Sequence, residues 1–153
     1  VAVGGVDEGN PEAISEQQLK QWSSEGVIEW WGPQADMTQI YRKAHVVVLP
    51  SYAEGMPKVV MEAAACGRPA VTTDAPGCRE TVDHGVTGYL VPVRDTQQLT
   101  ARLRGLIESS ALRQRMGQAG RNKAVKEFSE SLVVQKTLDV YQTLLQKQSN
   151  ATQ

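Results

Sequence analysis

A short apolar run at residues 45–50 is the feature that most constrains the fold of this chain. It reads His-Val-Val-Val-Leu-Pro, without the alternation of apolar and polar side chains that marks a half-exposed strand. Such a run is typical of a central strand covered on both faces in a parallel sheet. Because parallel sheets bind ligands beyond the carboxyl ends of their strands, residues 51–55, which leave this strand, are predicted to lie at a binding cleft.

The residues that follow predict a helix whose first amides lack a cap. Pro57 suits the first position of a helix, which makes Met56 the capping residue. A methionine side chain has no oxygen to accept a hydrogen bond, so the N–H groups of Lys58 and Val59 stay open at the positive end of the helix dipole. Gly55 would let a ligand approach the backbone closely. Together these features predict an anion site, which a diphosphate would fit in shape and charge.

Two acidic residues, Glu54 and Glu62, flank this helix start. The helix continues to residue 66 and is apolar on nearly every face, so it is expected to be mostly buried against the sheet. A carboxylate there needs hydrogen-bond donors, and the ribose hydroxyls of a nucleotide would supply two to Glu62. The alternative is an ion pair between Glu62 and Lys58, worth only about 0.2–0.5 kcal/mol.

Several motifs together resemble a known family, the retaining glycosyltransferases of family 4, also called glycosyl transferases group 1. In order along the chain, they are Val47-Val48-Leu49-Pro50-Ser51, Glu54-Gly55, Glu62, residues 64–71, Glu80 and residues 85–92. They span most of the chain and are far more specific than the two acids alone. Enzymes of this family have two Rossmann-like domains, the B-type glycosyltransferase fold. The resemblance implies that this chain corresponds to the C-terminal, donor-binding domain.

The resemblance also implies roles for the residues at the helix start. Glu54 would contact hydroxyl groups of the donor sugar and is the catalytic candidate, while Glu62 would hold the ribose. The amides that would face the sugar and the diphosphate are those of Gly55, Met56, Lys58 and Val59. The family transfers a sugar from a nucleotide-sugar with retention of anomeric configuration, generally without a metal or other cofactor. Amides and cations would then stabilise the leaving diphosphate.

Two parts of the family pattern have no counterpart in this sequence. One is the N-terminal domain that binds the acceptor, so this fragment alone is expected to be inactive. The other is an Arg and Lys pair from the first strand-helix unit of the C-terminal domain. Residues 1–5 look like the second strand, and in the usual order 3-2-1-4-5-6 the first strand would lie between them and residues 45–50. We expect a preceding segment or a neighbouring chain to fill that gap; an uninterrupted sheet formed by this chain alone would contradict the assignment.

The rest of the sequence predicts a Rossmann-like α/β fold, a parallel sheet flanked by helices, followed by an all-helical segment. The expected strands are residues 1–5, 27–31, 45–50, 69–73 and 88–91. The expected helices are residues 12–25, 36–44, the helix after Pro57, a short one near 79–82, and 96–109, 111–126 and 130–148. These elements form one domain over residues 1–148, with a frayed tail at 149–153. In the family the last helix packs on the N-terminal domain.

Composition disfavours nucleic-acid binding and membrane spanning. The 153 residues carry a net charge of −1 and only 5% are aromatic, which leaves neither a basic face nor many side chains for base stacking. No apolar run is long enough to cross a bilayer. The cytoplasm is therefore the expected location, with peripheral association at the inner face of the membrane left open for the parent enzyme. Cys66 and Cys78 have neither metal nor disulfide spacing, and His45 and His84 belong to no ligand cluster, so no metal site is expected.

The sequence thus predicts the donor-binding half of a glycosyltransferase that builds a polysaccharide, lipopolysaccharide or glycolipid. Its partners would be a UDP- or GDP-linked sugar and a glycan or lipid-linked acceptor, the latter reached through the missing domain. Residues 10–14 and 76–80 resemble transferases that use UDP-linked N-acetylhexosamines. Two alternatives stay open: a non-catalytic Rossmann-like module for another phosphate-bearing ligand, and a nucleotide-sugar epimerase of the B-type fold. Arg79 and Glu80 could face the same cleft as Glu54, take part in a local ion pair or have a helix-end role.

Overall fold

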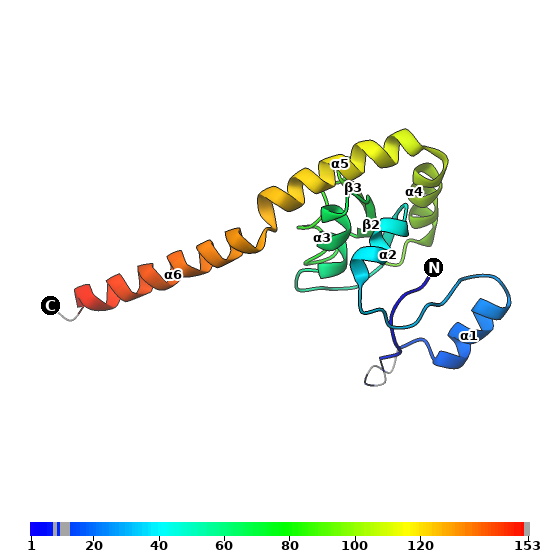
Figure 1. Ribbon diagram of the computed structural model, residues 1–153, viewed down its shortest axis with the longest axis horizontal. Coiled ribbons are helices and arrows are strands. Elements are labelled where there is room, and N and C mark those ends of the chain that lie inside the picture. Colours follow the sequence, from blue (N-terminus) through cyan, green and yellow to red (C-terminus); the bar gives the residue numbers. More distant parts are fainter. Residues whose placement is uncertain (8, 10–12, 152–153) are drawn as a thin grey trace. The chain divides into compact units, whose positions relative to one another are not determined.

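The computed structural model (Figure 1) describes residues 1–7, 9 and 13–151, without the side chains of residues 148–151. It divides into two compact units, Val1–Gln39 and Ile40–Gln153. The second unit contains a three-stranded parallel sheet with helices packed on it, which confirms the predicted α/β fold. The assignment of residues 1–148 to one domain stays a prediction.

Helices α1 (Glu16–Ser24) and α2 (Met37–Lys43) both begin after a polar capping residue. Ser15 Oγ accepts a hydrogen bond of 3.2 Å from the backbone N–H three residues later, and Asp36 Oδ1 accepts one of 3.3 Å in the same way. Such caps satisfy amides that have no partner within the helix. Both helices lie within the predicted ranges, and of those ranges Glu12 lies outside the described residues.

The two strands predicted in the first unit are wrong in extent. Residues 1–5 and 27–31 are joined only by a single parallel bridge between Ala2 and Trp30. The indole Nε1 of Trp30 also donates a hydrogen bond of 3.0 Å to the carbonyl oxygen of Gly4. Gly4 and Gly32 adopt positive φ angles of 130° and 63°, which turn the backbone out of an extended path just after the bridge. One further backbone hydrogen bond, of 2.9 Å from the N–H of Gly4 to the carbonyl oxygen of Gly32, follows the bridge, but these described segments form no longer ladder.

The sheet of the second unit consists of β1 (Val47–Leu49), β2 (Ala70–Thr73) and β3 (Gly88–Val91), in that spatial order and all parallel. All four residues of β2 are buried, as a central strand requires. The strand predicted at residues 45–50 is confirmed as parallel, but within the described chain it is an edge strand, and Val48 is 40% exposed. No described sheet joins residues 1–5 to β1, so the arrangement that would contradict their assignment is not observed.

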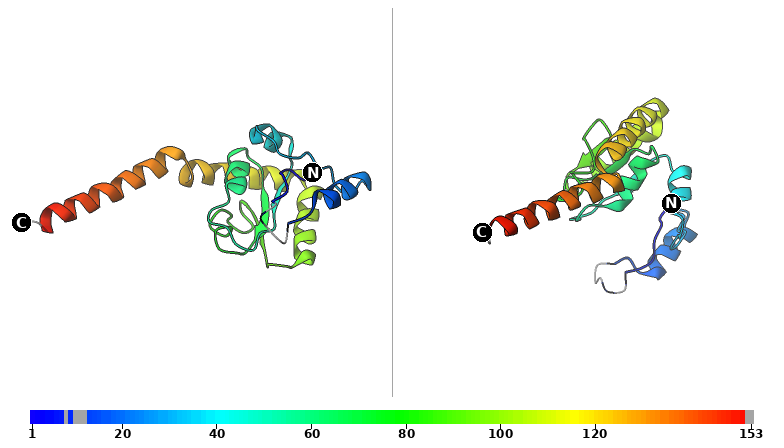
Figure 2. Two further views of the ribbon diagram at one scale, coloured as in Figure 1. Left: turned by 90° about the horizontal axis from the view of Figure 1, so that it is seen from below. Right: turned by 60° about the vertical axis from the view of Figure 1, so that its left-hand side comes forward.

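Three helices cover this sheet, namely α3 (Lys58–Ala65), α4 (Thr96–Glu108) and α5 (Ser110–Glu127), as Figures 1 and 2 show. Successive residues of β2 point to opposite faces. Val71 packs with Leu106 of α4 and Met116 of α5, whereas Ala70 packs with Val60 of α3. The sheet is therefore covered on both faces by apolar side chains. Polar residues gather beyond the carboxyl ends of its strands, a region called the carboxyl edge below.

The remaining differences from prediction concern a short turn and the last helix. Residues 76–81 form overlapping turns rather than the predicted helix near 79–82, where the N–H of Thr81 bonds to the carbonyl oxygen of Cys78, three residues back instead of the four of an α-helix. Helix α6 (Glu130–Ala151) is longer than predicted and includes part of the expected tail, of which residues 152 and 153 lie outside the described residues. Of its described side chains, only Leu132 is partly buried.

Candidate functional site

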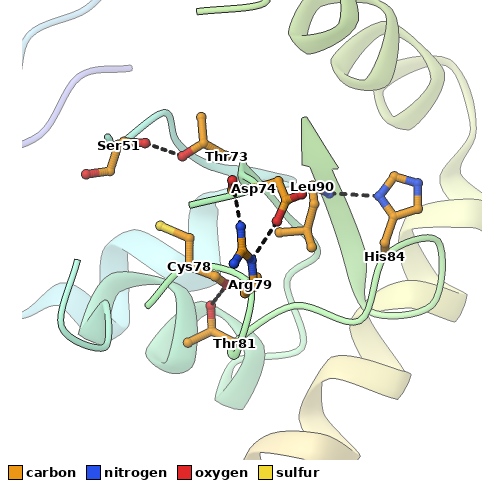
Figure 3. Close-up of polar contacts among 8 residues, drawn as sticks. All are labelled: Ser51, Thr73, Asp74, Cys78, Arg79, Thr81, His84 and Leu90. Atoms are coloured by element: carbon orange, nitrogen blue, oxygen red, sulfur yellow. Dashed lines mark hydrogen bonds and ion pairs between the residues drawn. The ribbon is translucent and has the colours of Figure 1, made fainter. Parts of the chain in front are cut away.

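The loops that leave β1, β2 and β3 meet at the carboxyl edge of the sheet. Thr73, the last residue of β2, donates its hydroxyl hydrogen to the carbonyl oxygen of Ser51 in the first loop (Figure 3). The N–H of Asp74 donates a hydrogen bond of 2.8 Å to the carbonyl oxygen of Val91, at the end of β3. These contacts fix the three loops to one another, so residues far apart in the sequence share one surface.

Glu54 is held in the first loop by two hydrogen bonds. Its carboxylate Oε1 accepts one of 2.7 Å from the hydroxyl of Ser51, and its backbone N–H donates one of 3.0 Å to the carbonyl oxygen of Pro76. The side chain is partly buried. The second carboxylate oxygen has no hydrogen-bond donor among the described residues, so Glu54 can accept a hydrogen bond from a ligand.

A glycine lets the loop after β2 come close to this acid. Gly77 has a φ of 80°, and a Cβ atom added there would overlap the carbonyl oxygen of Glu54 and approach that of Gly55. Both the backbone angle and the lack of space therefore require glycine at this position. Gly55 itself has open space around it, as the predicted close approach of a ligand requires.

The start of α3 is uncapped by side chains, but the capping residue differs from the prediction. Pro57 is the N-cap, with an extended backbone (φ −70°, ψ 107°), and its carbonyl oxygen accepts the first helical hydrogen bond from Val60 N–H at 3.1 Å. The assignment of Met56 as the cap is therefore wrong. Proline also lacks a side-chain acceptor, so within the described chain the N–H groups of Lys58 and Val59 have no protein partner.

The prediction that α3 is buried on nearly every face is wrong. Only Val60, Ala63 and Ala64 are buried, and Glu62 lies on the exposed face. The prediction failed because apolar residues also occupy the exposed face, where Val59 is 36% exposed and Ala65 is exposed too. Solvent can therefore reach the carboxylate of Glu62, and so can a ligand.

Glu62 has a protein donor that the sequence analysis missed. The hydroxyl of Tyr41 donates a hydrogen bond of 3.0 Å to Glu62 Oε2, while Tyr41 itself is only 3% exposed. Burial, followed by this bond to a carboxylate, raises the pKa of Tyr41. The alternative ion pair between Glu62 and Lys58 is not formed among the described residues. A buried tyrosine in the apolar stripe of α2 was the available signal, since its hydroxyl needs a partner.

Two arginines also lie at this edge. Arg79 forms the local ion pair left open by the sequence, with its Nε 2.8 Å from Asp74 Oδ1 (Figure 3), and this contact raises the pKa of Arg79. Arg94, which the sequence analysis did not single out, lies over the ring of Tyr52 with its Cζ atom 5.3 Å from the ring centroid. Arg79 is thus paired with an acid, and Arg94 is in contact with an aromatic ring.

The described residues contain no group of three or more His, Cys, Asp and Glu side chains that could hold a metal ion. Both cysteines are free thiols, Cys66 partly buried and Cys78 buried. None of the helices in the described part of the chain is long and apolar enough to cross a membrane.

The fold and the site define a Rossmann-like α/β domain with an open helix start at the carboxyl edge of a parallel sheet. Residues 1–109 match the model of the family described as glycosyl transferases group 1. The chain belongs to this family, and it corresponds to the C-terminal domain of its members.

Curated relatives are similar over most of the chain. An N,N'-diacetylbacillosaminyl-diphospho-undecaprenol alpha-1,3-N-acetylgalactosaminyltransferase from Campylobacter jejuni is 30% identical over 145 residues, which are 95% of this chain and 37% of the relative. An N-acetyl-alpha-D-glucosaminyl L-malate synthase from Bacillus anthracis is 28% identical over 88% of this chain and 35% of the relative. The chain thus spans little more than a third of these relatives.

Solved structures share the fold. Anabaena Alr3699/HepE in complex with UDP superposes with a TM-score of 0.82 at 26% identity, over 92% of this chain and 40% of that one, and the same protein is also known with UDP-glucose. The C-terminal domain of a glycosyl transferase group 1 protein (LpcC) from Francisella tularensis has a TM-score of 0.62 at 26% identity, over 75% of this chain and 63% of that one.

Proposed function

We propose that this chain is the donor-binding domain of a retaining glycosyltransferase that moves a sugar from a UDP- or GDP-linked donor to a glycan or lipid-linked acceptor. The observation that carries the proposal is the uncapped start of α3 beside the partly buried Glu54, at the carboxyl edge of a parallel sheet. Relatives named as glycosyltransferases support it. Because the chain spans 37% of the first of these, the activity belongs to a longer enzyme that includes an acceptor-binding domain.

In this proposal the helix start takes the diphosphate. When the bond between the sugar and the diphosphate breaks, negative charge develops on the leaving oxygen. The open N–H groups of Lys58 and Val59 and the positive end of the helix dipole stabilise that charge. The amides of Gly55 and Met56 complete the lining. Such stabilisation needs no metal ion, and a metal-independent reaction is part of the proposal.

The two acids hold the two ends of the donor. Glu54, whose Oε1 is bound by Ser51, accepts a hydrogen bond from a sugar hydroxyl through its other oxygen. Glu62 accepts from the ribose in the same way, because Tyr41 occupies only Oε2. Each carboxylate is thus oriented by one protein donor and keeps one oxygen for the ligand, which is an economical way to position a hydrogen-bond acceptor.

We further propose that the donor is a UDP-linked N-acetylhexosamine used in surface-glycan assembly in the cytoplasm. This proposal is supported by the resemblance of residues 76–80 to such transferases. It is also supported by the names of the Campylobacter jejuni and Bacillus anthracis relatives and of a capsular polysaccharide glycosyltransferase, CapM, from Staphylococcus aureus.

Calorimetry on the full-length enzyme tests the donor site. A panel of UDP- and GDP-sugars should identify a binding nucleotide, and Glu62→Ala should weaken both the free nucleoside diphosphate and its sugar conjugate about tenfold, the loss of one hydrogen bond to a charged group. Glu54→Ala should abolish most turnover while the free nucleoside diphosphate still binds. Glu108→Ala, which removes an exposed acid at the end of α4, is the control.

The outcomes separate the proposal from its alternatives. Unchanged nucleotide affinity in Glu62→Ala would refute the ribose role, and equal losses of turnover and nucleotide binding in Glu54→Ala would make that residue structural. A change in the configuration of the donor sugar without transfer would indicate an epimerase. Binding of phosphate ligands with neither reaction would indicate a non-catalytic module.

A further inference from the structure

Arg94 has a backbone conformation that arginine rarely adopts. Its φ is 65°, and every other positive φ among the described residues belongs to a glycine. In this left-handed region the Cβ atom of an L-residue crowds its own backbone, so a residue other than glycine is disfavoured. A large side chain kept at such a position calls for a role.

The turn between β3 and α4 explains the positive φ at position 94, but it does not explain why the residue there is an arginine. The N–H of Asp95 donates a hydrogen bond of 3.2 Å to the carbonyl oxygen of Pro92, which places Arg94 third in a four-residue turn. Glycine is the residue preferred where that position has a positive φ. Asp95 then caps α4 by accepting a hydrogen bond of 2.9 Å from Gln98 N–H. Glycine at position 94 would meet all these needs without strain.

The side chain of Arg94 joins two loops of the candidate site. Its Cζ atom lies 5.3 Å from the centroid of the Tyr52 ring, within the range of a cation–π contact. Tyr52 follows β1 and Arg94 follows β3, so the contact links the loops of the two outer strands of the sheet. Tyr52 is two residues before Glu54 and is 59% exposed.

Hydrogen bonds hold that loop near both ends, and a weaker one of 3.3 Å joins the hydroxyl of Ser51 to the carbonyl oxygen of Ala53 within it. The carbonyl oxygen of Ser51 accepts a hydrogen bond from Thr73, and the N–H of Glu54 donates one to Pro76. Between these points the side chain of Tyr52 contacts Arg94 and has no other ring or hydrogen-bond partner among the described residues. Among the described residues, Arg94 is therefore the group from outside the loop that contacts the ring of Tyr52 in its middle.

We propose that Arg94 is a positioning residue for Glu54. By clamping the ring of Tyr52 it restrains the loop that carries the acid, and this benefit to turnover offsets the strained backbone. The inference rests on the proposed function and adds a residue to it. Arg94 acts through Tyr52 rather than on the diphosphate, so its loss should lower kcat and leave nucleotide binding unchanged.

Variants of the full-length enzyme test the clamp. Arg94→Gly should keep or raise the melting temperature, because it removes the strain, yet lower kcat about tenfold through a displaced acid. Tyr52→Leu should have the same effect on kcat, Tyr52→Phe should keep the ring and most of the turnover, and the double variant Arg94→Gly/Tyr52→Leu should lose no more than either single one. Affinity for UDP should change less than about twofold in all of them.

A matched control and a second readout distinguish the clamp from other effects. Arg102→Ala removes another arginine–tyrosine contact, 4.8 Å from the ring of Tyr89 on the α4 side, and should leave kcat unchanged. Amide hydrogen exchange, which needs no donor, should accelerate at residues 52–55 in Arg94→Gly and not in Arg102→Ala.

Three results would overturn the inference: unchanged kcat with unchanged exchange in Arg94→Gly, a lowered melting temperature that accounts for the lost turnover, or a loss of UDP affinity with kcat retained. Failure of the unmodified enzyme to bind or use any nucleotide-sugar would instead refute the proposed function, and the exchange data would still decide whether Arg94 restrains the loop.

Discussion

Tyr41 shows how a single buried hydroxyl shapes the candidate site. Its ring is part of the packing of α2, and its hydroxyl orients one oxygen of the exposed Glu62 carboxylate. The other residue-scale determinant is Ser51, which orients Glu54 in the same manner. Neither donor belongs to the acid-and-amide pattern that predicts the site. Both follow from the need of polar groups near a core to be hydrogen-bonded.

Replacement of Tyr41 should change the stability of the protein at alkaline pH. The folded-state pKa of Tyr41 is raised above its unfolded value of about 10, so its contribution to stability is complete below about pH 10 and is lost as the pH rises through the folded-state pKa. Tyr41→Phe should lower the free energy of unfolding by about 1 kcal/mol at neutral pH, the value of one hydrogen bond. Above pH 10, the free energy of unfolding of this variant should fall less steeply than that of the original chain.

Urea unfolding at a series of pH values measures this effect. Tyr141→Phe, at an exposed position of α6, is the control and should follow the original chain at every pH. If the free energies of unfolding of Tyr41→Phe and of the original chain fall in parallel above pH 10, burial and the bond to Glu62 do not raise the pKa of Tyr41.

At the scale of elements, glycines set the distance between α3 and α5. Gly117 of α5 is buried, and a Cβ atom there would overlap the carbonyl oxygen of Gly67, which has a φ of 69° and follows the end of α3. Arg121 donates a hydrogen bond from its guanidinium to the carbonyl oxygen of Ala65, at the same end. Because α3 carries the candidate anion site, its position depends on this contact.

Two glycine substitutions should therefore act in opposite directions. Gly117→Ala should destabilise the protein by about 1–3 kcal/mol, because its side chain meets backbone that cannot yield. Gly105→Ala, in α4, has open space around the new Cβ and should stabilise it by about 0.5–1 kcal/mol through helix propensity. Thermal or urea unfolding measures both, and a stabilising Gly117→Ala would refute the close packing of α5 on this loop.

Sequence patterns predict the elements whose signals are local. The apolar runs of β1, β2 and β3 and the periodic helices from Thr96 onward lie close to their predicted bounds, and the uncapped start of α3 follows from residue types that offer no acceptor. The strands at residues 1–5 and 27–31 were overestimated because the extent of pairing depends on a partner distant in sequence. The Tyr41–Glu62 bond and the contact of Arg94 with Tyr52 were missed for the same reason.

At the scale of the whole molecule, α6 presents apolar side chains that the described chain does not cover. Val134, Leu138 and Tyr141 recur at spacings of four and three, so they lie along one stripe of the helix, and each is about half exposed or more. This chain covers only 37% of the first relative. As part of the proposed function, we propose that the stripe is the surface on which an acceptor-binding domain packs.

A charge placed on this stripe should therefore lower the stability and turnover of the full-length enzyme but leave the stability of this chain alone nearly unchanged. Leu138→Glu should change the unfolding free energy of this chain alone by less than about 0.5 kcal/mol, as for other exposed sites, but should lower the melting temperature and the turnover of the full-length enzyme. Thr143→Glu, on the opposite face of the same helix, is the control. Equal behaviour of the two variants in the full-length enzyme would contradict the interpretation.

The absence of a side chain at Gly77 has a consequence for redesign of the candidate site. The loop after β2 rests on the backbone of Glu54 through this one residue, with no room between them. Exchange of the first loop to change the sugar specificity therefore requires exchange of the second loop as well, because the two loops are in direct contact at Gly77. Libraries that keep Glu54 but randomise its neighbours in residues 51–56 alone would displace the acid more often than libraries that vary both loops together.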